Sequence, residues 1–248
     1  MRKTILITGA SSGLGRGMAK EFAAMGRNLA LCARRTDRLE ELKQELAAAH
    51  PDIKVSIKAL DVLDYEKVFE VFREFRQEFG SLDRVIVNAG MGKGQPLGTG
   101  YFWANRQTAE TNFVAALAQC EAAMEIFREQ NDGHLVMISS MSAMRGMPKN
   151  LTTYAATKAG VAALTEGIRM EMIGKPIKVS TIYPGYIRSE INEKVKNTPF
   201  MVDTETGCKL LAKAIEKESA EACVPSWPWT PMGLAMRNLP LPLVKKLI

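Results

Sequence analysis

Histidine and cysteine are scarce in this sequence of 248 residues. It contains two histidines, His50 and His134, which lie far apart, and four scattered cysteines that form no CxxC pair. Zinc sites depend on closely spaced ligands, and disulfide frameworks depend on dense cysteine pairs. We therefore expect no metal site, reduced thiols and a cytoplasmic protein.

Long hydrophobic runs are also missing. No uninterrupted apolar stretch reaches the roughly 18 residues that indicate a transmembrane helix. At the N-terminus, Arg2-Lys3 leads into the short segment TILIT and then a glycine-rich turn, a pattern that differs from a secretory signal peptide. The sequence therefore predicts a soluble chain with neither a transmembrane helix nor a secretory signal peptide.

The excess of positive charge is not concentrated in one segment. The net charge is +6, yet lysines and arginines alternate with acids in stretches such as DRLEELKQELAAA at 37–49. Nucleic-acid-binding proteins usually gather their basic residues on one face or stripe. We therefore expect no nucleic-acid partner, and a basic surface that favours phosphorylated small molecules.

Apolar runs alternate with amphipathic segments along the whole chain. We expect strands at 3–8, 28–33, 54–60, 84–89, 134–139, 178–183 and 222–224. We expect helices near 14–25, 37–49, 64–79, 104–130, 153–173 and 204–218. This alternation predicts one α/β domain over 1–248, a doubly wound parallel sheet of about seven strands with helices on both faces. Five of the eleven prolines fall in 225–248, which predicts an extended or broken-helix tail.

A glycine-rich turn, TGASSGLGRG at 8–17, follows the first expected strand. Gly9, Gly13 and Gly15 allow a tight turn in which backbone N–H groups and the start of a helix approach a pyrophosphate. The spacing G-x-x-x-G-x-G also fits an ordinary strand-to-helix turn. Its place after the first strand of an alternating chain favours a dinucleotide site.

The segment YAATK at 154–158 sets a tyrosine four residues before a lysine. On a helix these side chains share one face, about one turn apart. The Lys158 ammonium can then lower the pKa of the Tyr154 phenol from about 10 toward neutrality, as proton transfer requires. Taken alone, the pair also fits a solvated helix face.

These motifs together resemble the short-chain dehydrogenase/reductase family over about residues 3–190. The resemblance is carried by TGASSGLG, by NAG at 88–90, by Asn112, by the serines of ISSMS, by YAATK and by the PG of YPGYIRSE. It implies a Rossmann-type domain, a nicotinamide cofactor and hydride transfer between a carbonyl and an alcohol. Tyr154 would be the acid in reduction and the base in oxidation, with its pKa lowered by Lys158 and the positive nicotinamide ring together.

The resemblance also implies a serine that holds the substrate oxygen at the end of the fifth strand. Ser140 is the matching residue, but it precedes Tyr154 by fourteen positions, one more than is common in the family. Ser142 therefore remains an alternative, whereas Ser139 should face the other side of the strand. Asn112 resembles the family's helix asparagine, which supports a water-mediated proton path through the lysine. The alternative interpretation of Asn112 is a polar helix residue turned to solvent.

Further cofactor contacts follow from position in the family pattern. Leu14 accompanies Ser11, Ser12 and the glycines of the first turn, Asp61 and Val62 would hold the adenine, and Asn88, Ala89 and Gly90 would line the ribose side. The nicotinamide would be flanked by Pro184, Gly185, Ile187 and Ser189, together with Tyr154 and Lys158.

The end of the second expected strand indicates which dinucleotide is preferred. Arg34 and Arg35 follow Ala33, and no acid occurs until Asp37. A carboxylate at this point selects NAD, whereas guanidinium groups suit the 2′-phosphate of NADP(H). We therefore expect NADP(H). The alternative is that both arginines are solvated, Arg35 more so than Arg34.

The substrate and partners are less sharply defined by the sequence. Residues 186–203 would cover the substrate, and Phe200 and Met201 favour an apolar one. Trp227 and Trp229 suggest that 225–248 packs on the pocket or a neighbouring subunit, with membrane contact as a weaker alternative.

We expect an NADPH-dependent carbonyl reductase or secondary-alcohol dehydrogenase. A 3-oxoacyl-thioester reductase and a non-catalytic NADPH-sensing protein are the alternatives. Family resemblance also implies a homodimer or homotetramer formed through the helices at 104–130 and 153–173.

Overall fold

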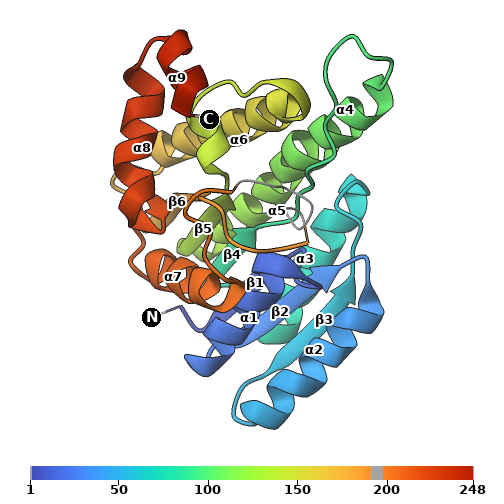
Figure 1. The fold of residues 1–248 in the computed structure, drawn as a ribbon. Helices are drawn as coiled ribbons and strands as arrows, with labels where there is room; N and C mark the ends of the chain where they lie inside the picture. The colour runs from blue at the N-terminus through green and yellow to red at the C-terminus, as the bar shows by residue number, and fades with distance from the viewer. Residues whose placement is uncertain (1, 191–197, 248) are drawn as a thin grey trace.

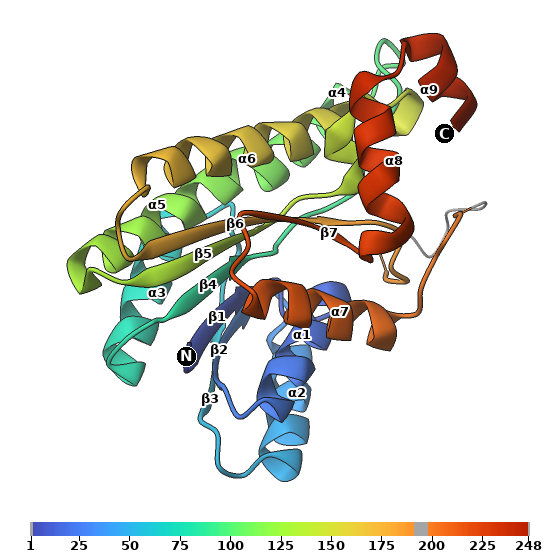
Figure 2. The same ribbon diagram turned by 90° about the vertical axis from the view of Figure 1, so that its left-hand side faces the viewer.

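The computed structural model describes residues 2–190 and 198–247. In this part of the chain, seven strands form one sheet in the order β3-β2-β1-β4-β5-β6-β7, and every neighbouring pair is parallel. Figure 1 shows the order from β3 to β6, and Figure 2 also labels β7. The strands are β1 Thr4–Thr8, β2 Asn28–Ala33, β3 Val55–Ala59, β4 Arg84–Val87, β5 Gly133–Ile138, β6 Ile177–Pro184 and β7 Glu221–Val224. The doubly wound parallel sheet predicted from the sequence is confirmed.

Helices cover both faces of the sheet, as Figure 2 shows. One face carries α1 Gly13–Ala24, α2 Thr36–Ala49 and α7 Thr204–Glu216; the other carries α3 Tyr65–Phe79, α5 Ala115–Gln130 and α6 Thr152–Glu171. Strand residues alternate between the two hydrophobic cores, so Leu6 packs in one while Ile5 and Ile7 pack in the other. All three are fully buried, as expected for a strand covered on both faces.

The long helix expected at 104–130 is interrupted. The chain forms α4 Phe102–Ala109, a π-helical turn, η1, at Glu110–Val114, and then α5 without leaving the helical path. Two short 3₁₀ helices, η2 Met141–Met144 and η3 Lys149–Leu151, precede α6. These departures lie close to the carboxyl ends of the strands, where a doubly wound sheet binds its ligands.

The proline-rich tail consists of two helices, α8 Ser226–Asn238 and α9 Leu241–Leu247. The broken-helix alternative is therefore correct and the extended one is wrong. Trp227 has non-helical backbone angles, which places Pro228 at the start of the regular part of α8, where a missing N–H costs little. Pro240 follows the end of α8, which is where a residue unable to continue a helix is expected.

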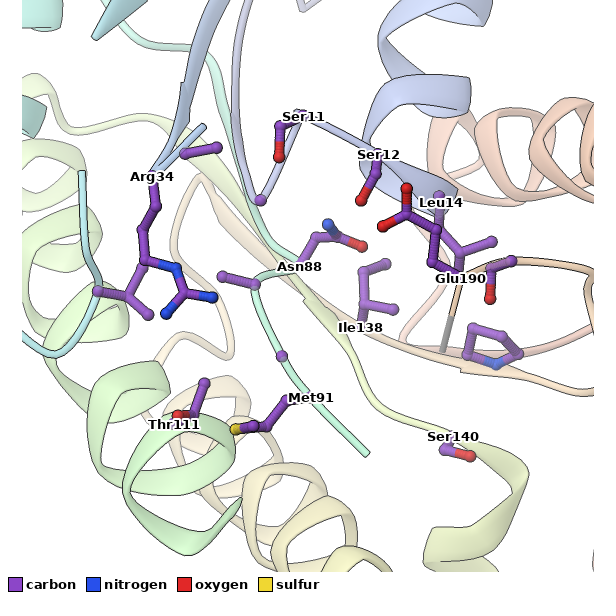
Figure 3. Close-up of a pocket in the computed structure, with 18 of the residues that line it drawn as sticks. Ser11, Ser12, Leu14, Arg34, Asn88, Met91, Thr111, Ile138, Ser140 and Glu190 are labelled. Carbon is purple, nitrogen blue, oxygen red and sulfur yellow. The ribbon is translucent and has the colours of Figure 1, made fainter. Parts of the chain in front are cut away.

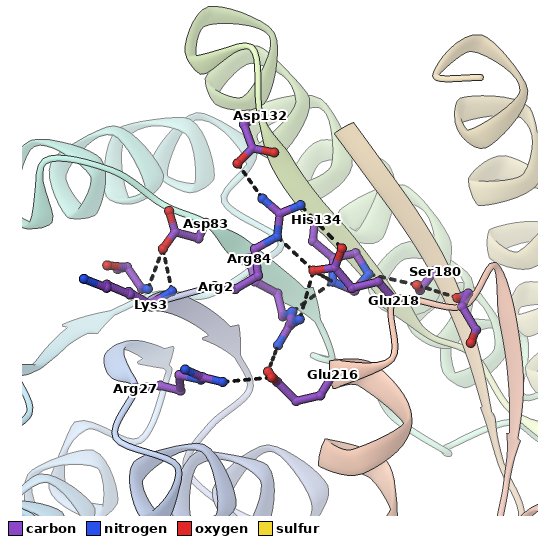
Figure 4. A network of polar contacts seen from close by, with 12 residues as sticks. Arg2, Lys3, Arg27, Asp83, Arg84, Asp132, His134, Ser180, Glu216 and Glu218 are labelled. Atoms are coloured by element: carbon purple, nitrogen blue, oxygen red, sulfur yellow. Dashed lines mark hydrogen bonds and ion pairs between the residues drawn. The ribbon is translucent and has the colours of Figure 1, made fainter. Parts of the chain in front are cut away.

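A buried polar network joins the strands at their amino ends, opposite the carboxyl edge (Figure 4). Arg84 is 1% exposed; its Nε donates to His134 Nδ1 at 2.9 Å, and its other nitrogens bond Glu216 and Glu218. Because Arg84 can only donate, His134 carries its hydrogen on Nε2, 2.8 Å from Ser180 Oγ. Burial, followed by the charge of Arg84, holds the pKa of His134 well below its usual value. This histidine therefore ties β4, β5 and β6 together as a neutral ring.

Candidate active site

A cleft of about 330 Å³ opens at the carboxyl ends of the strands (Figure 3). It is lined by segments that follow six different strands, from β1 to β6. Nearly all of the residues predicted from the sequence line it: Gly9, Ser11, Ser12, Gly13, Leu14, Arg34, Arg35, Asp61, Val62, Asn88, Ala89, Gly90, Ser140, Tyr154, Lys158, Pro184, Gly185, Ile187 and Ser189. Gly15 and Asn112 lie just behind these lining residues. Met91, Gln107 and Thr111 also line the cleft, and the sequence motifs did not indicate them.

The glycine-rich turn is compact because its backbone requires glycine. Gly9 and Gly13 have φ angles of +67° and +52°, in the left-handed region that other residues rarely adopt. A Cβ on Gly15 would clash with the Gly9 carbonyl oxygen and would come within 2.7 Å of Asn88 Nδ2. Gly15 therefore allows the turn to pack against Asn88, while the start of α1 remains open to the cleft.

The arginines after β2 are arranged differently from the expectation. Arg35 donates to Ser11 Oγ at 3.3 Å and to Ser12 Oγ at 2.5 Å, so it is fixed to the glycine-rich turn. The Arg34 side chain is 69% exposed and lies 3.9 Å from the Asp61 carboxylate, whereas that of Arg35 is 42% exposed. The expectation that Arg35 is the more solvated of the two is therefore wrong. Arg35 is the less exposed of the two because the hydroxyls of the turn serines accept hydrogen bonds from its guanidinium group.

Two further charged residues join this end of the cleft. Arg38, on the first turn of α2, donates to Glu190 Oε1 at 2.5 Å, and Arg35 donates to Glu190 Oε2 at 3.2 Å. Arg38 follows Arg35 by three positions at a helix start, so the helical period could have indicated it. Glu190 is more than 150 positions away from both arginines, and no sequence pattern indicated it.

Tyr154 and Lys158 lie on α6 and face the cleft, with Lys158 Nζ 6.0 Å from the centre of the phenol ring. Lys158 is 6% exposed, and its Nζ donates to the Ile138 carbonyl at 2.8 Å. Burial lowers the pKa of Lys158 to about 8. Burial also raises the pKa of Tyr154, and the neighbouring Ser140 hydroxyl acts in the opposite direction. The protein's own groups therefore do not produce the lowered phenol pKa expected from the sequence.

Three serines near the end of β5 have different surroundings. Ser140 lines the cleft, and its Oγ accepts from the Ser142 backbone N–H at 3.1 Å. Ser139 also borders the cleft, but it is buried and its hydroxyl donates to the Lys158 carbonyl at 2.8 Å. Among the described residues that line the cleft, Ser140 is included and Ser142 is not. Ser140 therefore lines the same cleft as Tyr154, although the interval between them is one residue longer than is common.

Asn112 lies in the π-helical turn and is 1% exposed, so its solvent-exposed alternative is wrong. Its side chain bonds both the N–H and the carbonyl of Met91, each at 2.8 Å. A Cβ on Gly90 would lie 3.2 Å from Asn112 Oδ1 and 3.6 Å from Lys158 Nζ, so both side chains border the same glycine. π-turns of this kind are frequent at functional sites.

The tail packs next to the part of the cleft that follows β6. Trp229 of α8 is buried and makes edge contacts with Tyr186 at 5.7 Å and Phe200 at 6.3 Å between ring centres. Ile187 forms a bridge with Val202, which closes the base of the predicted covering segment 186–203. Residues 191–197 of that segment lie outside the described residues. Through Trp229, the tail therefore packs against Gly185, which lines the cleft.

The burial of Lys158 predicts a cost to stability. The folded chain releases this proton near pH 8 and the unfolded chain near 10.5, so at pH 7 burial costs about 3 kcal/mol, offset in part by the bond to Ile138. Lys158→Met should therefore raise the free energy of unfolding at pH 7 by about 1–2 kcal/mol. Between pH 8 and 10.5 the unfolded state binds more protons than the folded state, so the free energy of unfolding of the wild type rises with pH. The stability advantage of Lys158→Met over the wild type therefore shrinks across this range.

Thermal unfolding at pH 7 and pH 9.5 measures this difference. The exposed Lys209→Met serves as a control that removes the same charge without relieving burial, and it should leave the melting temperature nearly unchanged. A Lys158→Met variant that melts below the wild type at pH 7 would show that the buried ammonium stabilises the fold.

No helix in the described part of the chain is long and apolar enough to cross a membrane. Within residues 2–190 and 198–247, no three histidine, cysteine, aspartate or glutamate side chains gather in a way that could hold a metal ion.

The sequence is similar to known oxidoreductases over almost its full length. The family described as "short chain dehydrogenase" matches residues 3–199. An uncharacterized oxidoreductase of Mycobacterium tuberculosis is 54% identical over 245 residues, which cover 99% of this chain and 97% of the relative. An uncharacterized oxidoreductase of Myxococcus xanthus is 35% identical, with 97% and 94% covered.

Solved structures share the fold. Levodione reductase is 31% identical with a TM-score of 0.73, covering 77% of this chain and 74% of that one. An alcohol dehydrogenase of Thermococcus sibiricus, complexed with 5-hydroxy-NADP, is 24% identical with a TM-score of 0.80, covering 89% and 95%. A short-chain dehydrogenase/reductase of Burkholderia phymatum, in complex with NAD, is 21% identical with a TM-score of 0.84, covering 99% and 95%. With its doubly wound sheet and the family match over 3–199, this chain belongs to the short-chain dehydrogenase/reductase family of oxidoreductases.

Proposed function

We propose that this protein is an NADP(H)-dependent oxidoreductase that reduces an apolar ketone, with Tyr154 as the proton donor. The observation that carries the proposal is the layout of one cleft. At one end the glycine-rich turn meets Arg35, and at the other Tyr154, Ser140 and Lys158 meet. The first end suits a dinucleotide phosphate and the second suits proton transfer to an oxygen.

The residues present fit a nicotinamide dinucleotide. The positive φ angles of Gly9 and Gly13 keep the backbone close to the cleft, and the start of α1 offers N–H groups to a pyrophosphate. Asp61 and Val62 would hold the adenine side, with Asn88 to Gly90 along the ribose. When bound, the cofactor would supply the hydride and, in its oxidised form, a positive charge near the phenol.

Proton transfer would then depend on the chain's own side chains. Tyr154 would donate its phenolic proton to the carbonyl oxygen while the Ser140 hydroxyl stabilises the charge developing there. Because burial raises the pKa of Tyr154, the phenol stays protonated at neutral pH, which suits the acid role in reduction. Lys158, with a pKa of about 8, could return a proton to the phenolate, and Asn112 would keep the adjoining turn in place.

An apolar substrate is supported by the aromatic side chains that pack next to Gly185 of the cleft. Trp229 contacts both Tyr186 and Phe200, and the Ile187–Val202 bridge joins the two ends of the covering segment 186–203 beside them. A 3-oxoacyl thioester remains the alternative substrate class, because its acyl chain would suit the same apolar surface. The tail 225–248 would contribute to this pocket through Trp229.

We also propose that the protein forms a homodimer or homotetramer. The helices that the family resemblance predicts as an interface carry exposed apolar side chains: Phe113, Val114 and Leu117 are 36–40% exposed, and Met170 is 67% exposed. Association would remove this surface from water. Light scattering at micromolar concentration should give a multiple of 27.3 kDa, and a mass near 27.3 kDa would contradict the proposal.

A panel of ketones and 3-oxoacyl thioesters, assayed by loss of NADPH absorbance, tests the proposed function. At least one apolar ketone should be turned over. Ser140→Ala should lower kcat by about 10²-fold, as for loss of one hydrogen-bond donor to a developing oxyanion, whereas Ser142→Ala should stay within about threefold of wild type. Unchanged NADPH affinity in both variants would show that the cofactor site is intact.

Turnover of thioesters alone would select the alternative substrate class. A larger loss in Ser142→Ala than in Ser140→Ala would show that Ser142 contacts the substrate. Tight NADPH binding with no turnover of any compound would favour the non-catalytic sensing protein.

A further inference from the structure

Glu190 is held by a cluster of donors at the phosphate end of the cleft. Arg38 donates to Oε1 at 2.5 Å, and both terminal nitrogens of Arg35 lie 3.2 Å from Oε2. The hydroxyl of Ser12 also interacts with this carboxylate, and Figure 3 shows Glu190 beside Ser12. One carboxylate therefore receives donors from the glycine-rich turn, from the end of β2 and from α2.

This cluster has the donor set of a phosphomonoester site. Two guanidinium groups and a hydroxyl converge on one anion, and guanidinium groups bind carboxylate and phosphate oxygens with the same planar geometry. Arg35 and Arg38 carry two positive charges against the single charge of Glu190. A phosphate dianion in the place of the carboxylate would therefore balance the two arginines more fully.

The position of the cluster matches the part of a dinucleotide that differs between NADP and NAD. In doubly wound sheets, residues after the second strand bind the adenine ribose, and an arginine there accommodates a 2′-phosphate. Arg35 lies two residues beyond the end of β2 and is fixed to both serines of the turn. The anion that these donors would hold in a bound cofactor is therefore the 2′-phosphate.

We propose that Glu190 is a built-in competitor of the cofactor's 2′-phosphate, so that NADPH must displace it from Arg35, Arg38 and Ser12 whereas NADH leaves it in place. The inference rests on the proposed use of a nicotinamide dinucleotide by this cleft. Glu190 thereby weakens NADPH binding selectively and reduces the discrimination between the two cofactors. Its carboxylate side chain is 51% exposed, so it can leave the cluster without repacking the core.

Dissociation constants of NADPH and NADH, measured by calorimetry, test this role. Exposed ion pairs are individually weak, so Glu190→Gln should tighten NADPH binding by about three- to tenfold and change NADH binding by less than twofold. Glu70→Gln removes the same charge from an exposed pair with Lys67 on α3 and should change neither constant. In an Arg35→Ala/Arg38→Ala background, the effect of Glu190→Gln should disappear.

The decisive quantity is the dissociation constant of NADH divided by that of NADPH. This ratio is compared between Glu190→Gln and Glu70→Gln. An unchanged ratio overturns the inference, as does equal tightening of both cofactors, which would indicate general repulsion by the carboxylate. A wild type that binds both cofactors equally would contradict the proposed NADP(H) preference. A rise of the ratio in Glu190→Gln would still support the competitor role in that case.

Discussion

Tyr154→Phe is expected to lower kcat for carbonyl reduction by about 10³-fold, which corresponds to about 4 kcal/mol in the barrier. The substitution removes the only atom of this side chain that can donate a proton and keeps the ring that packs beside Ser140 and Lys158. NADPH affinity and the melting temperature should therefore change little. Stopped-flow measurement of NADPH oxidation under single-turnover conditions separates the chemical step from product release.

Tyr65→Phe provides the matched control for this loss. Tyr65 is the first residue of α3 and is 37% exposed, outside the residues that line the cleft. Its hydroxyl should contribute nothing to turnover. Near-wild-type kcat in Tyr154→Phe would remove Tyr154 from the mechanism, and a parallel loss of NADPH affinity would instead indicate a role in holding the cofactor.

NADPH is expected to be preferred over NADH by at least about tenfold in kcat/KM, equivalent to about 1.4 kcal/mol. Arg34 and Arg35 follow β2, and each guanidinium can make charge-assisted bonds to a 2′-phosphate. Arg34→Asp should abolish or reverse the preference, because a carboxylate at this strand end accepts from a ribose hydroxyl and repels the phosphate. Initial rates with both cofactors at varied concentration measure the change.

A comparison with Arg35→Ala assigns the contribution of each arginine. Arg35 is fixed by Ser11 and Ser12, so less side-chain freedom is lost when it binds an anion, and its removal should cost more NADPH affinity than Arg34→Ala. Arg106→Ala, which removes an exposed arginine paired with Glu110 within one helical stretch, controls for net charge. Equal use of both cofactors by the unmodified protein would contradict the expected preference.

The sheet and its turn could be predicted because their signals are local. Strand β1 is a continuous run of buried residues, which marks a parallel strand covered on both faces, and the glycines that follow it encode the turn directly. The i to i+4 spacing of Tyr154 and Lys158 likewise placed both on one face of α6. Each of these features depends on neighbours within a few positions.

Other features depend on contacts between distant segments. The π-helical turn at Asn112 accompanies its bonds to Met91, 21 positions away, and the helical pattern of 104–130 contains no sign of it. The pairing of Arg35 with Glu190 spans 155 positions. The raised pKa of Tyr154 in the protein without cofactor could not be predicted from the spacing, which indicated only a nearby ammonium, because burial of the phenol and of Lys158 follows from the packed cleft.

Transfer of deuterium to a ketone substrate from NADPH that carries deuterium at both C4 positions tests the central proposal most directly. The protein is incubated with labelled cofactor and the best ketone of the panel, and the alcohol is examined by mass spectrometry. We expect one deuterium on the carbinol carbon with wild type, and at least about 10³-fold slower labelling with Tyr154→Phe. Tight NADPH binding without deuterium in any alcohol would contradict the assignment of this cleft as a reductase site.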